Sequence, residues 1–550
     1  MTLGRVGFTL IPMSKLILNF PDSYRPNENQ IKILNAIEKA IANNDKFIVC
    51  NAPTGSGKSF IAPTLAKYAG DAHSEWRSKV DDYSIFNDDG AVFAKESELF
   101  GVYALTITKA LQDQYKDTFD FATLLKGQGN YQCEYDPEVT VDNAPCLYVK
   151  GLKKECWDCN RCSYYNDRNK MLKGSFATLN YSMYFSLPEH LKRRKILVLD
   201  EASELEEQLV GQFTCEVDIP FLMKTETSVG AFPSDEKAIN VLNWLNKTSS
   251  AIATSIASYM EYLKNKKNKD SEFFKKTTEC NKLQRLQKSI ELLISTYYDS
   301  QYIVERVDRT IKFTPLKVDK LSKYLFDNAD HVVLLSATII DPASFCKTLG
   351  IFDYAYVEVE SKFDAAKSPI YILAKQKINF QNLKSLLPTI CKQIDGILEE
   401  HADHKGIIHT HTQYIADYIR DNVRNKRLLC REIGVKNEDI LEQHIASKEP
   451  TVLVSPSMTY GVDLKGDLAN FQIVLKAPWL PTKDARIEKM MKLDSSWYVN
   501  KMLCTLVQAC GRGVRGEEDK CPTYILDGGI FDAIAKNKRK LPKYFLDRLH

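Results

Sequence analysis

An octet of small residues that ends in Lys-Ser constrains this chain more than any other feature. Residues 52–59 read Ala-Pro-Thr-Gly-Ser-Gly-Lys-Ser, with an apolar run over 47–50 before them and a helix-like run over 60–68 after them. In the order strand, loop, helix, backbone N–H groups surround an anion and the helix N-terminus points at it. The octet predicts a phosphate-binding loop, although Ala52 stands where the usual pattern has Gly. The alternative is a glycine-rich turn before a helix.

The residue types of the octet assign roles to its members. Lys58 would reach the terminal phosphates of a nucleoside triphosphate, and the Ser59 hydroxyl would hold Mg²⁺. We therefore expect ATP and Mg²⁺ as ligands. The loop residues expected to bind the nucleotide are Ala52, Pro53, Thr54, Gly55, Ser56, Gly57, Lys58 and Ser59.

Bulk composition narrows the class of protein. A chain of 550 residues that is 44% hydrophobic is long enough for about three or four domains. The net charge of +3 is nearly neutral, so any nucleic-acid surface must be a local groove. We find no apolar run of membrane-spanning length and no signal-peptide pattern. We therefore expect a protein that is not secreted, in the cytoplasm of a bacterial or phage-infected cell or in a nucleus.

Two further apolar runs end in polar residues. Residues 196–199 lead into Asp200 and Glu201, as in a buried parallel strand with carboxylates at its C-terminal edge. Asp200 would contact Mg²⁺ and Glu201 would deprotonate the attacking water, whereas most acidic pairs are solvated surface charges. Residues 332–335 lead into Ser336-Ala-Thr338. These hydroxyls would pass the state of the nucleotide site to a neighbouring domain, or simply end a strand before a helix cap.

Two arginines near the C-terminus complete an ATPase pattern. In Gln508-Ala-Cys-Gly-Arg512-Gly-Val-Arg515 they are three residues apart, on one helical face. Planar guanidinium groups suit phosphate oxygens, so Arg512 and Arg515 would enter the nucleotide site from a second domain and stabilise transition-state charge. The ordinary alternative is a solvated helix face. Alternating strands and loops over 452–475 predict that second α/β domain.

Together these motifs resemble the superfamily 2 helicases, and within them the XPD/DinG-like iron–sulfur group, over nearly the whole chain. The matching segments are Tyr24-Arg25-Pro26 with Gln30, and residues 108–114, 406–410, 458–467 and 508–515. The resemblance implies nucleotide contacts from Gln30 and Asp463. It implies catalytic roles for Lys58, Asp200, Glu201, Gln508, Arg512 and Arg515. Two residues depart from the family pattern: Ser203 replaces the usual His of the Asp-Glu-Ala-His box, and Tyr460 replaces an acidic residue.

Five cysteines crowd into one segment between Gln114 and Asn180: Cys133, Cys146, Cys156, Cys159 and Cys162. Disulfides are disfavoured because the other cysteines are scattered singly, as in a reducing compartment. Zinc and a 4Fe–4S cluster both suit four thiolates at such spacing, so the residues alone leave both open.

The family resemblance separates these two metals. XPD/DinG-like helicases place a 4Fe–4S domain between the same two motifs, and residues 127–133 and 162–165 resemble its flanking sequences. The implied ligands are Cys133, Cys146, Cys156 and Cys162, with Cys159 as the alternative. Such a cluster would tie the insert together structurally.

A second insertion lies between Ser203 and Ser336. Residues from about 215 to 312 are expected to be largely helical, and the stretch 264–288 is rich in lysine. A solvated helix face is the ordinary interpretation of such a run. In the family this insertion forms an arch, which with the cluster domain makes a passage for single-stranded DNA, so some of these lysines would contact phosphates.

The predicted fold class is α/β, with two RecA-like parallel-sheet motor domains and two inserts in the first. Motor domain 1 has three parts (1–115, 179–214 and 313–365), interrupted by the iron–sulfur insert (116–178) and the arch (215–312), and motor domain 2 spans 366–550. The resemblance implies a monomeric ATP-dependent DNA helicase that moves 5′ to 3′ on single-stranded DNA and acts at single-strand/duplex junctions. It would grip the backbone near Thr108, Gln112, Ser455 and Gly461. The alternative is an ATP-regulated DNA clamp or scaffold that separates no strands.

Overall fold

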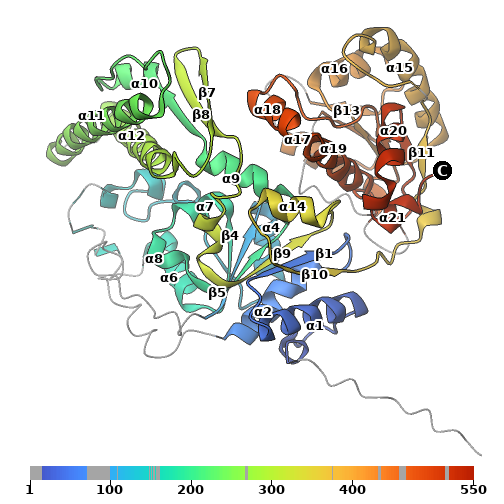
Figure 1. The fold of residues 1–550 in the computed structure, drawn as a ribbon, viewed down its shortest axis with the longest axis horizontal. Coiled ribbons are helices and arrows are strands. Elements are labelled where there is room, and N and C mark those ends of the chain that lie inside the picture. Colours follow the sequence, from blue (N-terminus) through green and yellow to red (C-terminus); the bar gives the residue numbers. More distant parts are fainter. Residues whose placement is uncertain are drawn as a thin grey trace, which may run out of the picture.

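Two parallel β-sheets, one in each half of the chain, organise the structure (Figure 1). The computed structural model describes residues 15–70, 100–107, 109–147, 149, 151–152, 155–156, 161–266, 270–374, 376–431, 435, 437–456, 466–514 and 519–550. Within these ranges the first sheet has seven strands, the second has six, and a smaller antiparallel sheet has three. Parallel sheets covered by helices are the architecture of α/β domains. The predicted α/β fold class is confirmed.

The first sheet has the strand order β10-β1-β9-β5-β2-β4-β3, with every neighbouring pair parallel. Its strands are β1 (Phe47–Asn51), β2 (Val102–Thr106), β3 (Thr123–Leu124), β4 (Phe176–Asn180), β5 (Arg194–Leu199), β9 (Ala329–Ser336) and β10 (Ala355–Glu358). The central strands are buried on both faces and therefore consist of nearly continuous apolar residues. Two hydrophobic clusters, one on each face, form the core of this N-terminal sheet domain.

The first long helix of the N-terminal sheet domain begins at an identifiable cap. Asn27 caps α1 (Glu28–Ala42) in a reciprocal capping box with Gln30, which satisfies two N–H groups at the helix start. The other helices of this domain are α2 (Ile61–Ala69), α4 (Lys109–Thr118), α6 (Ser163–Lys173), α7 (Tyr181–Ser186), α8 (Glu189–Lys192), α9 (Leu205–Phe213), α13 (Lys323–Phe326) and α14 (Pro342–Thr348).

The second sheet has the order β11-β16-β15-β12-β14-β13, again parallel throughout. Its strands are β11 (Ile370–Ile372), β12 (Gly406–His409), β13 (Leu428–Cys430), β14 (Val452–Ser455), β15 (Phe471–Val474) and β16 (Thr523–Ile525). The accompanying helices are α15 (Leu383–Glu400), α16 (Gln413–Asn422), α17 (Asn437–Ala446), α18 (Ala485–Leu493), α19 (Ser495–Cys510), α20 (Gly529–Asn537) and α21 (Lys543–Leu546). Two clusters again fill the faces of this C-terminal sheet domain.

A helical unit, residues 215–315, is inserted between β5 and β9 of the first sheet. It contains α10 (Ile219–Lys224) and two long paired helices, α11 (Ala238–Asn265) and α12 (Ser271–Thr296), which pack around their own hydrophobic core. The sequence did not predict its antiparallel sheet β6-β8-β7, formed by β6 (Cys215–Asp218), β7 (Tyr302–Val307) and β8 (Thr310–Pro315). Because β8 runs to Pro315, the unit extends beyond residue 312.

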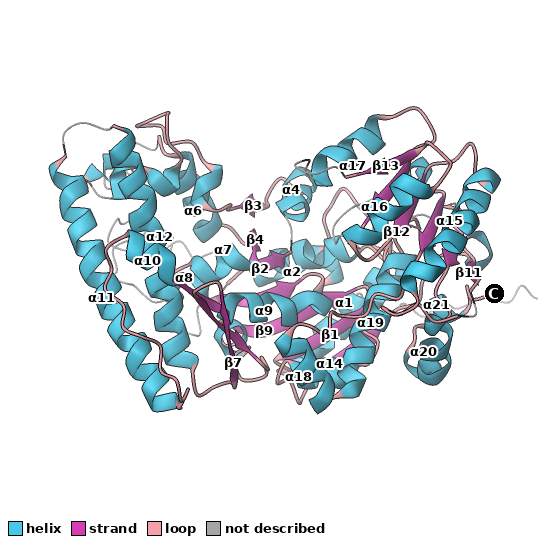
Figure 2. Ribbon diagram, turned by 90° about the horizontal axis from the view of Figure 1, so that it is seen from above, coloured by secondary structure: helices cyan, strands magenta, loops and turns pink. Residues whose placement is uncertain are grey.

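The two views place the helical unit and the C-terminal sheet domain on opposite flanks of the first sheet (Figures 1 and 2). The helical unit also contacts the cysteine-bearing insert. The Asn281 side chain on α12 donates to the Asp142 carbonyl at 2.7 Å and to Asn143 Oδ1 at 3.0 Å, and Arg285 lies 3.5 Å from the Asp142 carboxylate. Within the described ranges no helix has both the length and the apolar character of a membrane span.

Candidate nucleotide site

Two glycines with left-handed backbone shape the loop between β1 and the helix that follows it. Gly55 and Gly57 have φ values of 78° and 83°, a conformation that favours glycine. A Cβ at Gly57 would lie 2.2 Å from the amide nitrogen of Gln30, so there is no room for a side chain. Gln30 donates to the Gly57 carbonyl at 3.0 Å and accepts from the Asn27 N–H at 2.8 Å. Gln30 therefore supports the loop from behind.

Lys58 and Ser59 follow the loop on a short 3₁₀ turn, Lys58–Phe60, that leads into α2. The Lys58 ammonium donates to the carbonyl of Ala52, the first residue of the octet, at 2.8 Å. The cation is thus held over the loop, at the place where phosphate oxygens bind in sites of this type.

The acidic pair lies at the end of β5, beside the loop. Asp200 accepts hydrogen bonds from Tyr115 Oη at 3.3 Å and from the Glu201 N–H at 3.0 Å. Burial raises the pKa of Asp200 to about 6, and the charge of Glu201 adds to the shift, while Lys58 opposes it. Glu201 has φ 51°, a left-handed conformation rare for a residue with a side chain. Such strained backbone is common at functional sites.

These groups face a cavity of about 510 Å³ that both sheet domains line. The N-terminal sheet domain contributes Lys58, Ser59, Asp200 and Glu201, and the C-terminal sheet domain contributes Gln508 and Arg512. The domains touch at its edge, where Gln508 Nε2 donates to the Ser203 hydroxyl at 3.0 Å and Tyr544 Oη donates to the Ala337 carbonyl at 3.3 Å. One cavity thus brings the phosphate loop, the acidic pair and an arginine of the second domain together.

Comparison with known proteins gives one consistent family. Residues 408–547 match the family described as "Helicase C-terminal domain". The chain is 23% identical over 563 residues to the ATP-dependent DNA helicase XPD of Sulfolobus acidocaldarius, covering 90% of this chain and 95% of that protein. It is 22% identical to the ATP-dependent DNA helicase YoaA of Haemophilus influenzae, covering 92% of this chain and 91% of that protein.

Solved structures agree on the fold. A structure of an XPD helicase superposes with a TM-score of 0.59 at 17% identity, covering 94% of this chain and 98% of the other. The structure of S. tokodaii Xpd4 superposes with a TM-score of 0.55 at 14% identity, covering 95% of this chain and 99% of the other. In sequence and in fold, the chain is thus similar to the XPD/DinG-like helicases of superfamily 2.

Most of the predicted nucleotide-site residues line the cavity. They are Pro53, Thr54, Gly55, Gly57, Lys58, Ser59, Asp200, Glu201, Gln508 and Arg512. Gln30, Ala52 and Ser56 are buried and do not line it. Asp463 and Arg515 lie outside the described residues, as do Thr108, Tyr460 and Gly461. The Gln112 side chain is fully buried and donates to the Thr178 carbonyl, so a DNA contact near this position stays a prediction that does not involve this side chain.

The sequence did not reveal several residues that also line the cavity, and four of them come from two distant segments. Phe363 and Ser368 come from the segment that connects the two sheet domains, and Tyr544 and Arg548 come from the C-terminal end. None belongs to a motif with a recognisable spacing, so no signal in the sequence identified them.

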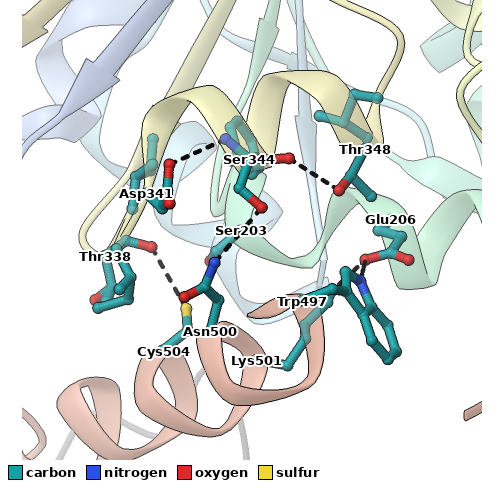
Figure 3. A pocket seen from close by; sticks show the side chains of 14 residues that line it. Ser203, Glu206, Thr338, Asp341, Ser344, Thr348, Trp497, Asn500, Lys501 and Cys504 are labelled. Carbon is teal, nitrogen blue, oxygen red and sulfur yellow. Dashed lines mark hydrogen bonds and ion pairs between the residues drawn. The ribbon is translucent and has the colours of Figure 1, made fainter. Parts of the chain in front are cut away.

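A second contact between the sheet domains surrounds a buried carboxylate (Figure 3). Glu206 on α9 accepts from Arg486 at 2.5 Å, and from Lys501 and Trp497 at 2.9 Å each, all from α18 and α19. Burial alone would raise the pKa of Glu206, but Lys501 and Arg486 outweigh it and lower the pKa to about 2. Nearby, Cys504 donates to the Thr338 carbonyl at 3.4 Å.

The candidate cluster ligands lie near one another. Burial raises the pKa of the Cys146 thiol to about 12, and the neighbouring thiols of Cys156, Cys162 and Cys133 raise it further, so all four are within electrostatic reach. Cys133 and Cys146 share one small hydrophobic cluster, against which Cys156 packs. Cys159 lies outside the described residues. Within the described ranges, however, no group of three or more His, Cys, Asp or Glu side chains is arranged to hold a metal ion.

Proposed function

We propose that this chain is an ATP-dependent DNA helicase that moves on single-stranded DNA and separates duplex strands. One observation carries the proposal: Lys58 and Glu201 of one sheet domain face Arg512 of the other across a single cavity. A nucleotide bound there would touch both domains, so its hydrolysis would change their relative position. The relatives named as ATP-dependent DNA helicases support DNA as the track.

Each group around the cavity has a role suited to its chemistry. Backbone N–H groups of the loop and Lys58 bind the terminal phosphates. Ser59 and Asp200 would hold Mg²⁺, which neutralises phosphate charge when bound. Glu201 orients and deprotonates the attacking water, and Arg512 donates to the oxygens that gain negative charge in the transition state. By resemblance, Arg515 would add a second guanidinium and Asp463 a further nucleotide contact.

Two polar contacts provide a route from the nucleotide to domain movement. Gln508, near the end of α19, lines the cavity and donates to Ser203, two residues after Glu201. Cys504, on the same helix, donates to the carbonyl of Thr338 in the Ser336-Ala-Thr338 segment. Loss of phosphate contacts on hydrolysis would loosen α19 from both motifs, because the same short segment carries Arg512.

The inserts would guide the strand. We assign the cysteine-bearing insert as a 4Fe–4S domain held by Cys133, Cys146, Cys156 and Cys162, with a structural role, and the helical unit as the arch. Their mutual contact through Asn281 and Asp142 supports a joint role. The family resemblance supports 5′-to-3′ movement and binding at single-strand/duplex junctions.

Strand-displacement assays test this function against the alternative of a DNA clamp. DNA-stimulated ATP hydrolysis with displacement of duplexes carrying a 5′ tail is expected, and 3′-tailed duplexes should remain intact. Lys58→Ala should abolish hydrolysis and displacement while single-strand binding persists, because the ammonium contacts phosphate and not DNA. ATP turnover stimulated by DNA without any displacement would favour the clamp. Turnover indifferent to DNA would contradict both.

A further inference from the structure

The end of the chain folds back onto the segment that connects the two sheet domains. After α21, the Arg548 carbonyl accepts from the Ile370 N–H at 2.6 Å, and the His550 N–H donates to the Ile370 carbonyl at 2.9 Å. Leu549 forms a parallel bridge with the same residue. This pairing extends the edge of the second sheet beside β11 and brings Arg548 into the wall of the nucleotide cavity.

Arg548 is a buried cation in that wall. Its side chain is 5% exposed, and it forms no ion pair with a carboxylate among the described residues. Nε donates to the Ser368 carbonyl at 2.6 Å and Nη1 donates to the Cys510 carbonyl at 3.0 Å. Nη2 is buried and has no hydrogen-bond partner in the described structure. Carbonyl dipoles only partly compensate a buried positive charge, so this environment favours an anion.

A second polar atom in the same wall is also unsatisfied. The Ser368 hydroxyl is fully buried and has no hydrogen-bond partner among the described residues. Buried polar groups without partners are rare, and two in one cavity wall indicate that a ligand completes them. The cavity already contains a phosphate-binding loop and Arg512, so the anion for which it is built is a nucleotide phosphate.

We propose that Arg548 is an additional phosphate-binding residue of the nucleotide site, with the Ser368 hydroxyl beside it. Arg548 lies just beyond the span that matches the helicase family, which ends at residue 547. Its fixed Nε and Nη1 contacts leave one N–H edge for an oxygen of the nucleotide, and a planar guanidinium suits that task. The proposal rests on the proposed function, since it assumes that this cavity binds ATP.

The contacts of Arg548 also link two parts of the nucleotide site. Its Nη1 contact ends on Cys510, directly before Gly511 and Arg512, and its Nε contact ends on the connecting segment. A phosphate bound to Nη2 would therefore be joined through one guanidinium to both the arginine-bearing helix end and the connection between the domains. Arg548 thus holds these two segments in position as well as binding the phosphate.

Nucleotide-binding measurements on the full-length protein test the proposal. We compare wild type, Arg548→Met and Ser368→Ala in titrations with ATP, ADP and adenosine, and follow thermal stability of each. Arg539→Met is the matched control, because Arg539 is an exposed cation near the same end of the chain. Loss of a charged hydrogen bond should weaken ATP and ADP binding about tenfold or more in Arg548→Met, with adenosine binding unchanged. Ser368→Ala should show a smaller loss of the same kind.

A purely structural role for Arg548 would give a different pattern. Equal weakening for ADP and adenosine, or unchanged ADP affinity, would overturn the proposal. If Arg548→Met does not fold, Arg548→Lys is used in its place, because it keeps the charge and loses the planar edge. This variant should still weaken ADP binding more than adenosine binding. Failure of the proposed function is distinguishable, because wild type would then neither bind ATP nor hydrolyse it with DNA.

Discussion

The side-chain amide of Gln508 donates a hydrogen bond of 3.0 Å to the Ser203 hydroxyl, and this bond joins the two sheet domains at the nucleotide cavity. Ser203 occupies the position where related helicases usually have His. The shorter side chain thus still provides an oxygen for the partner domain. The departure from the family pattern therefore retains a polar link between the acidic pair and the arginine-bearing helix.

Replacing Ser203 with Ala should weaken domain closure on ATP. A hydrogen bond of this type contributes about 1 kcal/mol, which corresponds to a roughly fivefold change in an equilibrium constant. We expect KM for ATP to rise about fivefold in DNA-stimulated hydrolysis, with strand displacement reduced at low ATP. Ser186→Ala is the control, since the Ser186 hydroxyl bonds to Met183 within one helix. An unchanged KM in Ser203→Ala would show that the bond does not contribute to closure.

Replacing Glu206 with Gln should destabilise the contact between the sheet domains. Arg486 and Lys501 would keep their buried charges with only the more distant Glu207, at 3.8 and 3.5 Å, as a counter-charge. Removal of one partner of a buried ion pair costs about 3 kcal/mol. Thermal unfolding should show a clearly lower Tm. Glu488→Gln, which removes the partner of Lys492 from an exposed pair, should leave Tm nearly unchanged. Equal Tm values for both variants would contradict this role of Glu206.

The lowered pKa of Glu206 predicts that the stability of the protein depends on pH. The pKa of Glu206 falls from 4.5 to about 2 on folding, so the native state favours the ionised form. Its contribution is fully present above pH 4.5 and is lost as pH falls toward about 2. The Tm difference between wild type and Glu206→Gln should therefore be constant above pH 4.5 and shrink below it. A difference that grows on acidification would have the wrong sign.

Iron content and visible absorption test the cluster assignment. Protein purified without oxygen should be brown, and Cys133→Ser or Cys162→Ser should lose colour, iron and strand displacement, with ATP hydrolysis less affected. Cys391→Ser is the control, because Cys391 is a buried thiol in the core of the other sheet domain. Comparing Cys156→Ser with Cys159→Ser identifies which of them is a ligand. Zinc without iron in wild type would contradict the assignment.

Local patterns were sufficient for part of the site. The loop of residues 52–59 and the acidic pair Asp200-Glu201 each follow directly on a buried strand, so sequence order alone placed them at the same sheet edge. Arg512 was also predicted, because its motif has a fixed spacing. The strands β6, β7 and β8 were missed because the whole stretch 215–312 was interpreted from the helical spacing of its longer part.

Other parts depend on contacts between distant residues. Glu206 and Arg486 are far apart in the sequence, and neither has a pattern that predicts burial. The sequence also gave no sign that the Gln112 side chain is buried and donates to Thr178 on β4. Arg548 enters the cavity only because the chain end pairs with Ile370, a contact that no periodicity encodes. Tertiary packing, rather than local propensity, decides such positions.

The contact of Asn281 and Arg285 with Asp142 has a topological consequence. Both inserts begin and end in the first sheet domain, so on the proposed strand path their contact would close a loop of protein around the DNA. A linear polynucleotide can be threaded through from a free end, whereas a covalently closed circle requires the junction to part. Loading onto circles would therefore depend on separation of the contacts that Asn281 and Arg285 make with Asp142.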